Sequence, residues 1–578
     1  MKGVGTTRIS ALAITLLCCA GLAAPLYLFG QEQAFPARPG FHKDWSHRHV
    51  LFSNGGNSSL ERRLGATRET RVYEDWQLRF NKTFASAHAS PSAPFGWGGH
   101  HPSTSSNAKV DWNMSLGSAT LADGTYPATF VSDPLHASCN DWIVYGLAGK
   151  GKKNGQANLV AFTNLYVSGS GGNGQSGICE APGTHTDPKI MFALNLTTVK
   201  YGVIKTSPVL SLVGDKVAVV ESSAQGGTVF HVLTVAGNNS GTPTAAAAPA
   251  PGTLASVVLS TTADDSFASP WVDYGNDIGY VATNDGVLHK ITGIFLGIPT
   301  EVKSGPWPLT VAANQKLTSP VLDFDSGKIF LAGGNGMLYS VACTPLAPAD
   351  TTSCAVSSSV KVVAANSILD PPIVDSSSQR VYWFSNNDGL GANNPVLIQT
   401  DMDLVAQTTA SLLVGSPTNN GIIRAGTFDN DWFNTGNGNL WVCGYSRNGS
   451  GGPRPALLRF SIQGGNLATT PNANVVVSST NRDKCSAPTE VFNGTSELFF
   501  VGTGKSGIIG DTVCSSGCVQ SFAMEGNNIV RQAVAAENGL PSGIVLDNTD
   551  VNSPQAASIY FAQQGGYKAV KLTQSGLQ

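Results

Sequence analysis

A short pattern repeats along most of this chain and constrains its fold more than any other feature. In its clearest form it has a Ser-Pro or Asp-Pro pair, a few apolar residues, an Asp, an apolar run and an Asn/Asp-Gly turn. The clearest copies begin at Ser269, Ser319 and Asp370. A further copy begins at Ser207, and weaker copies begin at Ser132, Ala425, Ser486 and Pro541. The copies lie mostly about 50–60 residues apart, a period typical of propellers and solenoids.

The residues of one copy predict a small antiparallel sheet. Proline cannot donate a ladder hydrogen bond, so Pro320 suits the first residue of a strand. An Asp-containing turn separates it from a β-branched and aromatic strand, such as residues 380–384. The next turn, Asn335-Gly336, favours a hairpin because both residues tolerate positive φ. A third strand and a less regular fourth strand complete a sheet that cannot cover its own faces, and radial packing of the copies solves that problem.

The eight candidate copies predict an all-β chain folded as a β-propeller of seven or eight four-stranded blades. The first and last copies are the least regular, which leaves the smaller number open. No segment after residue 30 shows a long, capped period of 3.6 residues, so we expect few helices. Residues 110–115 are expected to supply an early strand that helps to close the ring.

The pattern S-P-x-x-D, followed by an apolar run and (N/D)-G-x-L-Y, resembles the PQQ-like, quinoprotein-type β-propeller repeat over about residues 115–578. The stretch from Thr129 to Tyr145 is also similar to a group of uncharacterised exported bacterial propeller proteins. These resemblances imply a propeller fold and export, and they leave PQQ and calcium open as ligands of the central funnel. The adjacent cysteines that such enzymes place beside the cofactor have no counterpart after residue 30, since Cys18-Cys19 falls in the apolar N-terminal segment.

The N-terminus predicts export by one of two routes. Lys2 and Arg8 precede an apolar stretch at residues 9–30, whose 22 residues would span about 33 Å as a helix. An uncleaved membrane anchor and a cleaved signal peptide both fit this stretch. We therefore divide the chain into a signal anchor or signal peptide (1–30), a partly ordered extension or linker (31–110) and the β-propeller (111–578). The propeller is expected outside the cytoplasm, either tethered to the membrane through residues 9–30 or secreted.

Eight cysteines follow the apolar segment, and their even number suggests disulfides in an exported chain. Cys343 with Cys354, and Cys514 with Cys518, are close enough in sequence to staple loops. Two wider pairs, Cys139 with Cys179 and Cys443 with Cys485, are weaker predictions. Reduced, buried thiols remain the alternative. The absence of any CxxC pair argues against a cysteine-rich metal site, and we predict no metal site.

The charge balance excludes one class of partner. The chain has 35 Lys and Arg residues against 38 Asp and Glu, and its net charge is -3. Nucleic-acid binding needs a basic surface that neutralises phosphates, so we expect no nucleic-acid partner. No cofactor is predicted from motifs. Two clusters of oxygen-bearing side chains, at 323–327 and 547–552, are compatible with calcium, but an Asp that caps its own turn explains them as well.

No catalytic constellation can be assigned from the sequence. There is no G-x-S-x-G motif, and no His follows His289. Carboxylates recur near the repeat strands, and three of them share one repeat position, which favours a role in turns. These carboxylates are Glu221, Asp273, Asp323, Asp375 and Glu490.

Four tryptophans are candidate aromatics for stacking on a sugar or a peptide, although filling gaps between blades explains them too. They are Trp307, Trp383, Trp432 and Trp441. The sequence thus predicts an exported propeller that binds or scaffolds a protein or carbohydrate ligand, and we lean against an enzyme. A quinone- or calcium-dependent oxidoreductase and a carbohydrate-acting enzyme that use the central funnel are the alternatives.

Overall fold

The computed structural model describes the propeller region with short gaps. The described residues are 52–53, 106–107, 109–132, 136–170, 176–262, 266–274, 276–323, 326–343, 354–375, 378–390, 393–415, 421–447, 452–492, 497–508, 514–548 and 555–573. The chain divides into two units, Met1–Pro39 and Gly40–Gln578, and every described residue belongs to the second. The apolar stretch at 9–30 and nearly all of the extension at 31–110 therefore lie outside the described residues. Among those described, no helix is long and apolar enough to cross a membrane.

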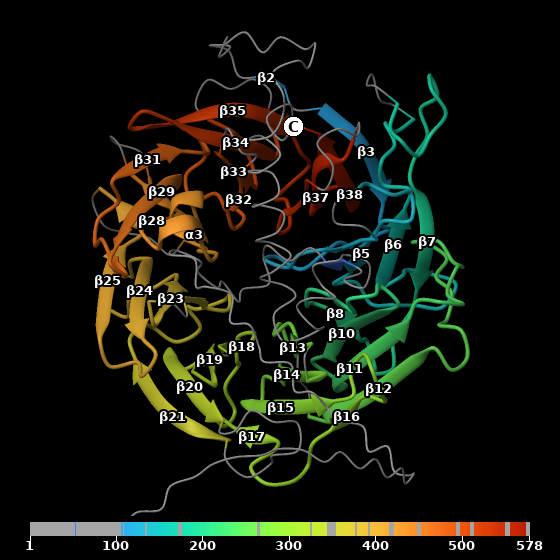
Figure 1. Cartoon of the computed structure of the whole chain (residues 1–578), viewed down its shortest axis with the longest axis horizontal. Coiled ribbons are helices and arrows are strands. Elements are labelled where there is room, and N and C mark those ends of the chain that lie inside the picture. The colour runs from blue at the N-terminus through green and yellow to red at the C-terminus, as the bar shows by residue number, and fades with distance from the viewer. Residues whose placement is uncertain are drawn as a thin grey trace, which may run out of the picture. The chain divides into compact units, whose positions relative to one another are not determined.

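Eight antiparallel sheets follow one another around a ring, so the fold is an eight-bladed β-propeller (Figure 1). In the first four blades, successive strands of the chain lie farther from the ring axis. Blade 1 contains β4 (Ala128–Val131), β5 (Trp142–Gly146), β6 (Leu159–Thr163) and β7 (Lys189–Leu194). Blade 2 contains β8 (Val203–Ile204) with β9 (Val209–Leu210), then β10 (Lys216–Ser223), β11 (Gly227–Thr234) and β12 (Leu254–Ser260). Blade 3 contains β13 (Trp271–Asp273), β14 (Ile278–Ala282), β15 (Val287–Thr292), and β16 (Thr300–Glu301) with β17 (Leu309–Thr310). Blade 4 contains β18 (Val321–Asp323), β19 (Lys328–Ala332), β20 (Met337–Cys343) and β21 (Cys354–Lys361).

The other four blades repeat this plan with local additions. Blade 5 contains β22 (Ile373–Asp375), β23 (Arg380–Ser385), β24 (Val396–Asp401) and β25 (Gln407–Ser411). Blade 6 contains β26 (Leu413–Val414), β27 (Thr427–Phe428), β28 (Gly438–Ser446), β29 (Arg454–Gln463), β30 (Asn466–Leu467) and β31 (Ala473–Val476), with the short helix α3 (Asn430–Thr435) after β27. Blade 7 contains β32 (Thr489–Phe492), β33 (Glu497–Thr503), β34 (Cys518–Glu525) and β35 (Asn528–Ala536). Blade 8 contains β36 (Val545–Asn548), β37 (Ala557–Gln563), β38 (Lys568–Thr573) and β3 (Lys109–Ser115).

Blade 8 closes the ring with strands from both ends of the propeller. β3 lies at the outer edge of this blade and pairs antiparallel with β38, with Ser115 opposite Lys568. The prediction of an early strand that helps to close the ring is therefore confirmed. Three short strands pair in parallel in other blades: β1 (Phe52–Ser53) with β4, β2 (Ser106–Asn107) with β35, and β26 with β28.

The antiparallel order gives the ring two distinct ends. The innermost strands begin at one end, here called the serine end because Ser207, Ser269 and Ser319 stand there. They finish at the other, here called the aspartate end because Asp273, Asp323 and Asp375 are the last residues of β13, β18 and β22. Turns between the first and second strands, and between the third and fourth, lie at the aspartate end because neighbouring strands alternate in direction.

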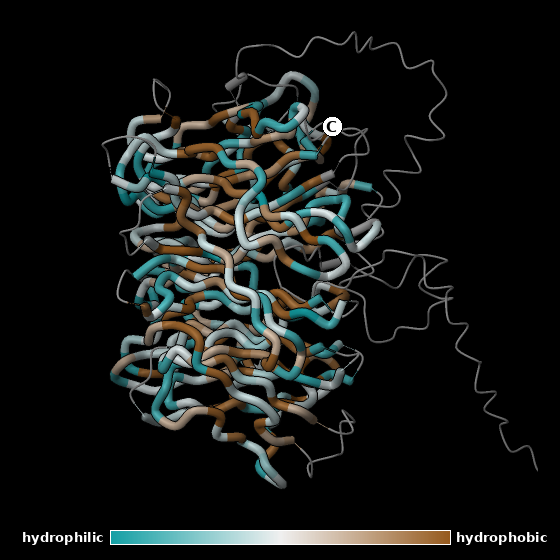
Figure 2. Tube along the Cα trace, turned by 90° about the vertical axis from the view of Figure 1, so that its left-hand side faces the viewer, coloured by the Kyte–Doolittle hydropathy of each residue, from teal (hydrophilic) through white to brown (hydrophobic). Residues whose placement is uncertain are grey.

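The core lies between the blades. One cluster joins Trp271 of blade 3, Phe330 of blade 4 and Trp383 of blade 5, and all three side chains are buried. Figure 2 shows apolar stretches alternating with polar ones along the described chain, as expected of strands connected by polar turns. Each sheet thus buries both faces against its two neighbours, which is why its strands read as nearly continuous apolar runs.

The prediction that a copy of the repeat begins at Ser132 is wrong, because the first strand of this copy lies before Ser132. The innermost strand of blade 1, β4, ends at Val131, so it lies before Ser132 rather than after it. Pro127 is the proline that precedes this strand. The hydroxyl and the N–H of Ser132 instead bond to Oδ1 of Asp141, at 2.7 and 2.8 Å. Ser132 therefore lies just after the innermost strand rather than at its start.

Candidate functional site

The aspartates at the shared repeat position serve the turns that follow the innermost strands. Asp273 accepts the N–H of Asn276 at 3.2 Å, and Asp323 accepts the N–H of Ser326 at 2.9 Å. In blade 5, Asp375 receives the N–H of Ser378 at 3.1 Å. All three carboxylates are buried. They therefore stabilise the reversal of the chain, which is the role in turns that their shared repeat position predicts.

The serines of the Ser-Pro pairs connect one blade to the next. The N–H of Tyr126 donates to Oγ of Ser207 at 3.0 Å, and the N–H of Ser207 donates to Oγ of Ser269 at 2.9 Å. The N–H of Ser269 donates in turn to Oγ of Ser319 at 2.8 Å. These bonds tie blades 1 to 4 together at the serine end. The sequence predicts the role of the proline in this motif but not the role of the serine.

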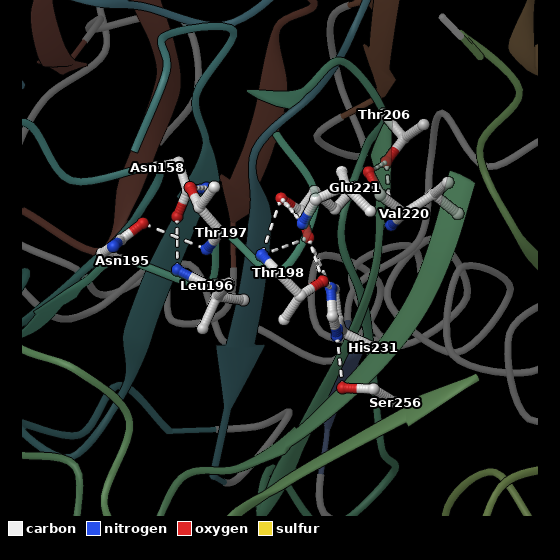
Figure 3. Close-up of polar contacts among 11 residues, drawn as sticks. Asn158, Asn195, Leu196, Thr197, Thr198, Thr206, Val220, Glu221, His231 and Ser256 are labelled. Atoms are coloured by element: carbon white, nitrogen blue, oxygen red, sulfur yellow. Dashed lines mark hydrogen bonds and ion pairs between the residues drawn. The ribbon is translucent and has the colours of Figure 1, made fainter. Parts of the chain in front are cut away.

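A hydroxyl, an imidazole and a carboxylate form a line of hydrogen bonds across three strands of blade 2 (Figure 3). Oγ of Ser256 on β12 lies 2.8 Å from Nδ1 of His231 on β11. Nε2 of His231 lies 2.9 Å from Oε2 of Glu221 on β10. His231 and Glu221 are fully buried, whereas Ser256 is exposed. A carboxylate only accepts, so in a neutral ring Nε2 carries the proton and Nδ1 accepts the Ser256 hydroxyl.

The buried carboxylate of this triad is held in place by the connection between blades 1 and 2. The N–H of Thr198 lies 3.0 Å from each carboxylate oxygen of Glu221, and the Thr198 hydroxyl donates to Oε2 at 2.6 Å. Figure 3 shows Thr198 and His231 approaching the same carboxylate. Glu221 is thus oriented by several donors, and it orients the imidazole in turn. A nucleophile is activated when a base lies beside it and a third group orients that base, and these three parts are present here.

A related arrangement in blade 3 lacks the exposed hydroxyl. His231 and His289 each lie opposite the fourth residue of the second strand of their blade, so they share one register position. Nδ1 of His289 lies 2.6 Å from Oε1 of Glu301, and Nε2 lies 3.1 Å from Oγ1 of Thr283. The Thr283 side chain is fully buried. Linking strands through a buried His–Glu pair is therefore a feature of two adjacent blades.

A second group of buried acids lies between blades 6 and 7. Burial, and then the charges of Glu490 and Asp429, raise the pKa of Glu497 to about 9. The pKa of Asp429 is also raised, chiefly by burial. Asp429 nevertheless caps α3, since its Oδ1 accepts the N–H of Trp432 at 3.0 Å. At neutral pH Glu497 is therefore protonated, which lets it hydrogen-bond to the neighbouring Glu490.

The chain that leads into blade 1 crosses the serine end of the ring. Asp123 forms an ion pair of 3.1 Å with Arg424 of blade 6 and approaches Lys484 of blade 7 at 3.4 Å. Arg424 is nearly buried and also pairs with Asp370 of blade 5 at 2.8 Å. The carbonyl of Thr125 accepts the N–H of Gly543, next to blade 8. A segment in contact with this many blades lies across the ring axis, and these charges hold it there.

The four candidate tryptophans are all buried. Trp383 donates its Nε1–H to Oγ1 of Thr400 at 3.0 Å. The Trp432 ring stacks on Phe428 and the Trp441 ring stacks on Phe499, with centroids 3.5 and 3.9 Å apart. Trp307 packs against Tyr280, with the ring centroids 5.7 Å apart. These rings fill space within and between blades, so none of them offers a face to a ligand in this conformation.

The eight cysteines after the apolar segment lie at disulfide distance in four pairs. The pairs are Cys139–Cys179, Cys343–Cys354, Cys443–Cys485 and Cys514–Cys518, with Cα–Cα distances of 5.4, 4.1, 6.4 and 5.6 Å. These are the four pairings that the sequence predicts. Several disulfides favour an oxidising, extracytoplasmic environment.

Two features that the quinoprotein resemblance implies, adjacent cysteines and a set of metal ligands, are not found among the described residues. Every cysteine among them is paired with a partner at least four positions away, so no pair of adjacent cysteines is present. Within the same residues, no group of three or more His, Cys, Asp or Glu side chains is arranged to hold a metal ion. Most of the second calcium candidate, at 547–552, lies outside the described part, as does Asp325 of the first.

One loop at the aspartate end exposes aliphatic side chains. In the connection between β15 and β16, Leu296 is 85% exposed and Ile298 is 82% exposed. The base of this loop is fixed, because Asp277 accepts the N–H groups of Phe295 and Leu296 at 2.7 and 2.9 Å. Nζ of Lys216 in blade 2 donates to the carbonyl of Phe295. The loop is thus anchored at its base and apolar at its tip.

Comparisons with known proteins assign no family to the chain. No family model matches the chain, and the comparison with curated proteins found no match. The C-terminal WD40 domain of Sif2 aligns with 82% of this chain and 100% of its own, at 11% identity and a TM-score of 0.46. Saccharomyces cerevisiae Sqt1 covers 81% of this chain and 100% of its own, at 10% identity and a TM-score of 0.45. A candidate 6-phosphogluconolactonase from Bacteroides fragilis covers 67% and 96%, at 13% identity and a TM-score of 0.35. The class that the sheets define is the eight-bladed β-propeller.

Proposed function

We propose that this protein is an exported, membrane-tethered propeller with quinoprotein-type repeats that binds a protein ligand through the aspartate end of its ring. The observation that carries the proposal is the loop between β15 and β16. Two almost fully exposed aliphatic residues in one short loop are unusual on a soluble surface, where apolar side chains are normally scattered. Leu296 and Ile298 are the side chains that we expect the ligand to cover.

The rigidity of the loop supports this proposal. Phe295 stacks on Tyr274, with ring centroids 5.8 Å apart and an interplanar angle of 11°. The carboxylate of Asp277 holds two consecutive N–H groups at the start of the exposed tip. Because the loop is ordered before a ligand arrives, less conformational entropy is lost when it binds.

Export and tethering rest on separate observations. The four cysteine pairs favour an oxidising compartment, and the apolar stretch at 9–30 follows two basic residues. The intact mass of the protein purified from the cells that produce it tests this part. A mass that includes residues 1–30 supports the anchor, and a mass that lacks them means that the protein is secreted after cleavage.

Site-specific photo-cross-linking tests the binding role. A photoreactive amino acid replaces Leu296 in one variant and Leu390 in another, and both are expressed in the producing cells. Leu390 is a matched control because it is also a well exposed leucine but lies in the connection between β23 and β24, at the serine end. We expect a discrete protein adduct from position 296 and none from position 390. Equal adducts at both positions, or none at either, would contradict the proposal.

A further inference from the structure

We propose that Ser256, activated by His231 and positioned through Glu221, is a nucleophile that attacks small acyl esters on the outer wall of blade 2. This activity goes beyond the proposed binding role and stands independently of it. The sequence offers no signal for it, because the three residues are 10 and 25 positions apart and carry no motif.

The two hydrogen bonds of His231 run in the direction that a base needs in order to activate Ser256. The Glu221 carboxylate takes the Nε2–H of His231, which leaves the Nδ1 lone pair to accept the Ser256 hydroxyl at 2.8 Å. A base within this distance of a hydroxyl is placed to remove its proton. Thr198 gives Glu221 two orienting donors, so the imidazole is held from behind.

The hydroxyl of Ser256 is accessible to solvent. A His–Glu pair that only links strands has no need of a hydroxyl that solvent can reach, and the hydroxyl of the related arrangement in blade 3, on Thr283, is fully buried. Ser256 is exposed on the outermost strand. Val258, two residues along the same strand and on the same face, is 55% exposed and offers an apolar contact for an acyl chain.

Two other blades carry a hydroxyl at the position that matches Ser256. In blade 4, Ser359 of β21 stands opposite Tyr339, and in blade 5, Thr409 of β25 stands opposite Ile398. These positions match Ser256 opposite His231 in blade 2. Hydroxyls at this place on the outer strand thus recur, but among these three blades blade 2 alone puts an imidazole beside one. Ser359 is exposed as well, so it provides an internal control.

The reaction balances without any further reagent. Oγ of Ser256 bonds to the carbonyl carbon of the ester while its proton passes to Nδ1 of His231. The bond to the leaving oxygen then breaks, and that oxygen departs as an alcohol with the proton from Nδ1. Water repeats the sequence on the acyl-serine, which releases a carboxylic acid and restores the hydroxyl.

The test uses a fluorophosphonate, which phosphonylates activated serines with loss of fluoride, followed by peptide mass spectrometry of the folded full-length chain. We expect one label at Ser256 and none at Ser359, and no label after denaturation. Hydrolysis of p-nitrophenyl acetate should fall at least about 100-fold in Ser256→Ala and in His231→Gln, as expected when a nucleophile or its base is lost. Ser359→Ala should match the wild type.

A positioning role for Glu221 has its own readout. Glu221→Gln should slow labelling at Ser256, and Glu221→Asp, which keeps a carboxylate, should restore part of the rate. Thermal unfolding of each variant identifies those that remain folded, and the wild-type labelling pattern needs no variant at all. Equal labelling of Ser256 and Ser359, or full labelling of folded His231→Gln, would overturn the proposal.

Discussion

Single serine hydroxyls join successive blades near the ring axis. Ser269 illustrates the device: its Oγ accepts the N–H of Ser207 in blade 2, and its own N–H donates to Ser319 in blade 4. The following proline contributes no N–H, so the serine supplies the polar connections of its pair. An acceptor at this position thus satisfies a partly buried backbone donor of the neighbouring blade.

Replacing Ser269 by alanine should weaken the ring at one joint. The N–H of Ser207 loses its acceptor in a partly buried position, so we expect a loss of about 1 kcal/mol in the free energy of unfolding. The shift of the urea midpoint measures it. Ser304→Ala is the control, because Ser304 is exposed and makes only a backbone bond in the turn before Trp307. Equal shifts in the two variants would show that the inter-blade bond contributes nothing.

At the scale of the strands, the repeat predicts much of what is observed. Blades 3, 4 and 5 begin, reverse and end where the copies at Ser269, Ser319 and Asp370 place them. The triad of blade 2 could not be predicted, because Glu221, His231 and Ser256 meet only through strand register. That register includes an irregularity between Thr228 and Val229 on β11. Tertiary pairing of this kind leaves no periodic trace in a sequence.

The start of β33 carries a carboxyl group that the fold keeps protonated. The pKa of Glu497 is raised to about 9 by burial and then by Glu490 and Asp429. The stabilisation that comes from this raised pKa is fully present below the ordinary pKa of a glutamate. It is lost as the pH rises toward 9. Glu497→Gln removes this titration while keeping an oxygen for the N–H of Asn430.

We therefore expect Glu497→Gln to be more stable than the wild type at pH 8, by about 1–2 kcal/mol, and little different at pH 4. Chemical denaturation at the two pH values measures this difference. Glu525→Gln is the matched control, since Glu525 is an exposed glutamate at the last residue of the neighbouring strand β34. A gain of the same size at both pH values would contradict the assignment.

Across the whole molecule, the shifted carboxyl groups set the pH of greatest stability. Burial raises the pKa of Asp141 to about 6 and that of Glu537 to about 7. These groups, with Glu497, favour the fold below about pH 4 and lose that contribution as the pH rises through their folded pKa values. Glu180 acts in the opposite sense: although burial opposes it, hydrogen bonds led by that from Ser168 lower its pKa to about 2. Its contribution is present above about pH 4.5 and is lost toward pH 2.

The two sets of groups predict maximal thermal stability in mild acid, at about pH 4–5, with a decline toward pH 9 and a second decline below pH 3. A calorimetric series of unfolding temperatures across this range checks the prediction. A midpoint that rises steadily from pH 5 to pH 9 would mean that the buried carboxyl groups ionise at little cost.

Ring closure offers a further prediction. Ser115 of β3 and Lys568 of β38 are paired across the closing sheet. A disulfide from Ser115→Cys with Lys568→Cys would close a very long loop, and we expect it to raise the free energy of unfolding by about 2–4 kcal/mol. Denaturant titration under oxidising conditions measures the gain. Ser115→Cys alone is the control. Equal denaturation midpoints for the two variants would contradict the prediction that β3 and β38 separate when the protein unfolds.

The pairing of β3 with β38 also has a consequence for biogenesis. β3 precedes all four strands of blade 1 from β4 to β7, whereas its partner β38 is the last strand among the described residues. A chain that emerges gradually from a ribosome cannot finish blade 8 until β38 has appeared. Until then, β3 presents an unpaired edge that can pair with other chains. The architecture therefore requires that this edge be protected during synthesis, by a chaperone or by rapid completion of the ring.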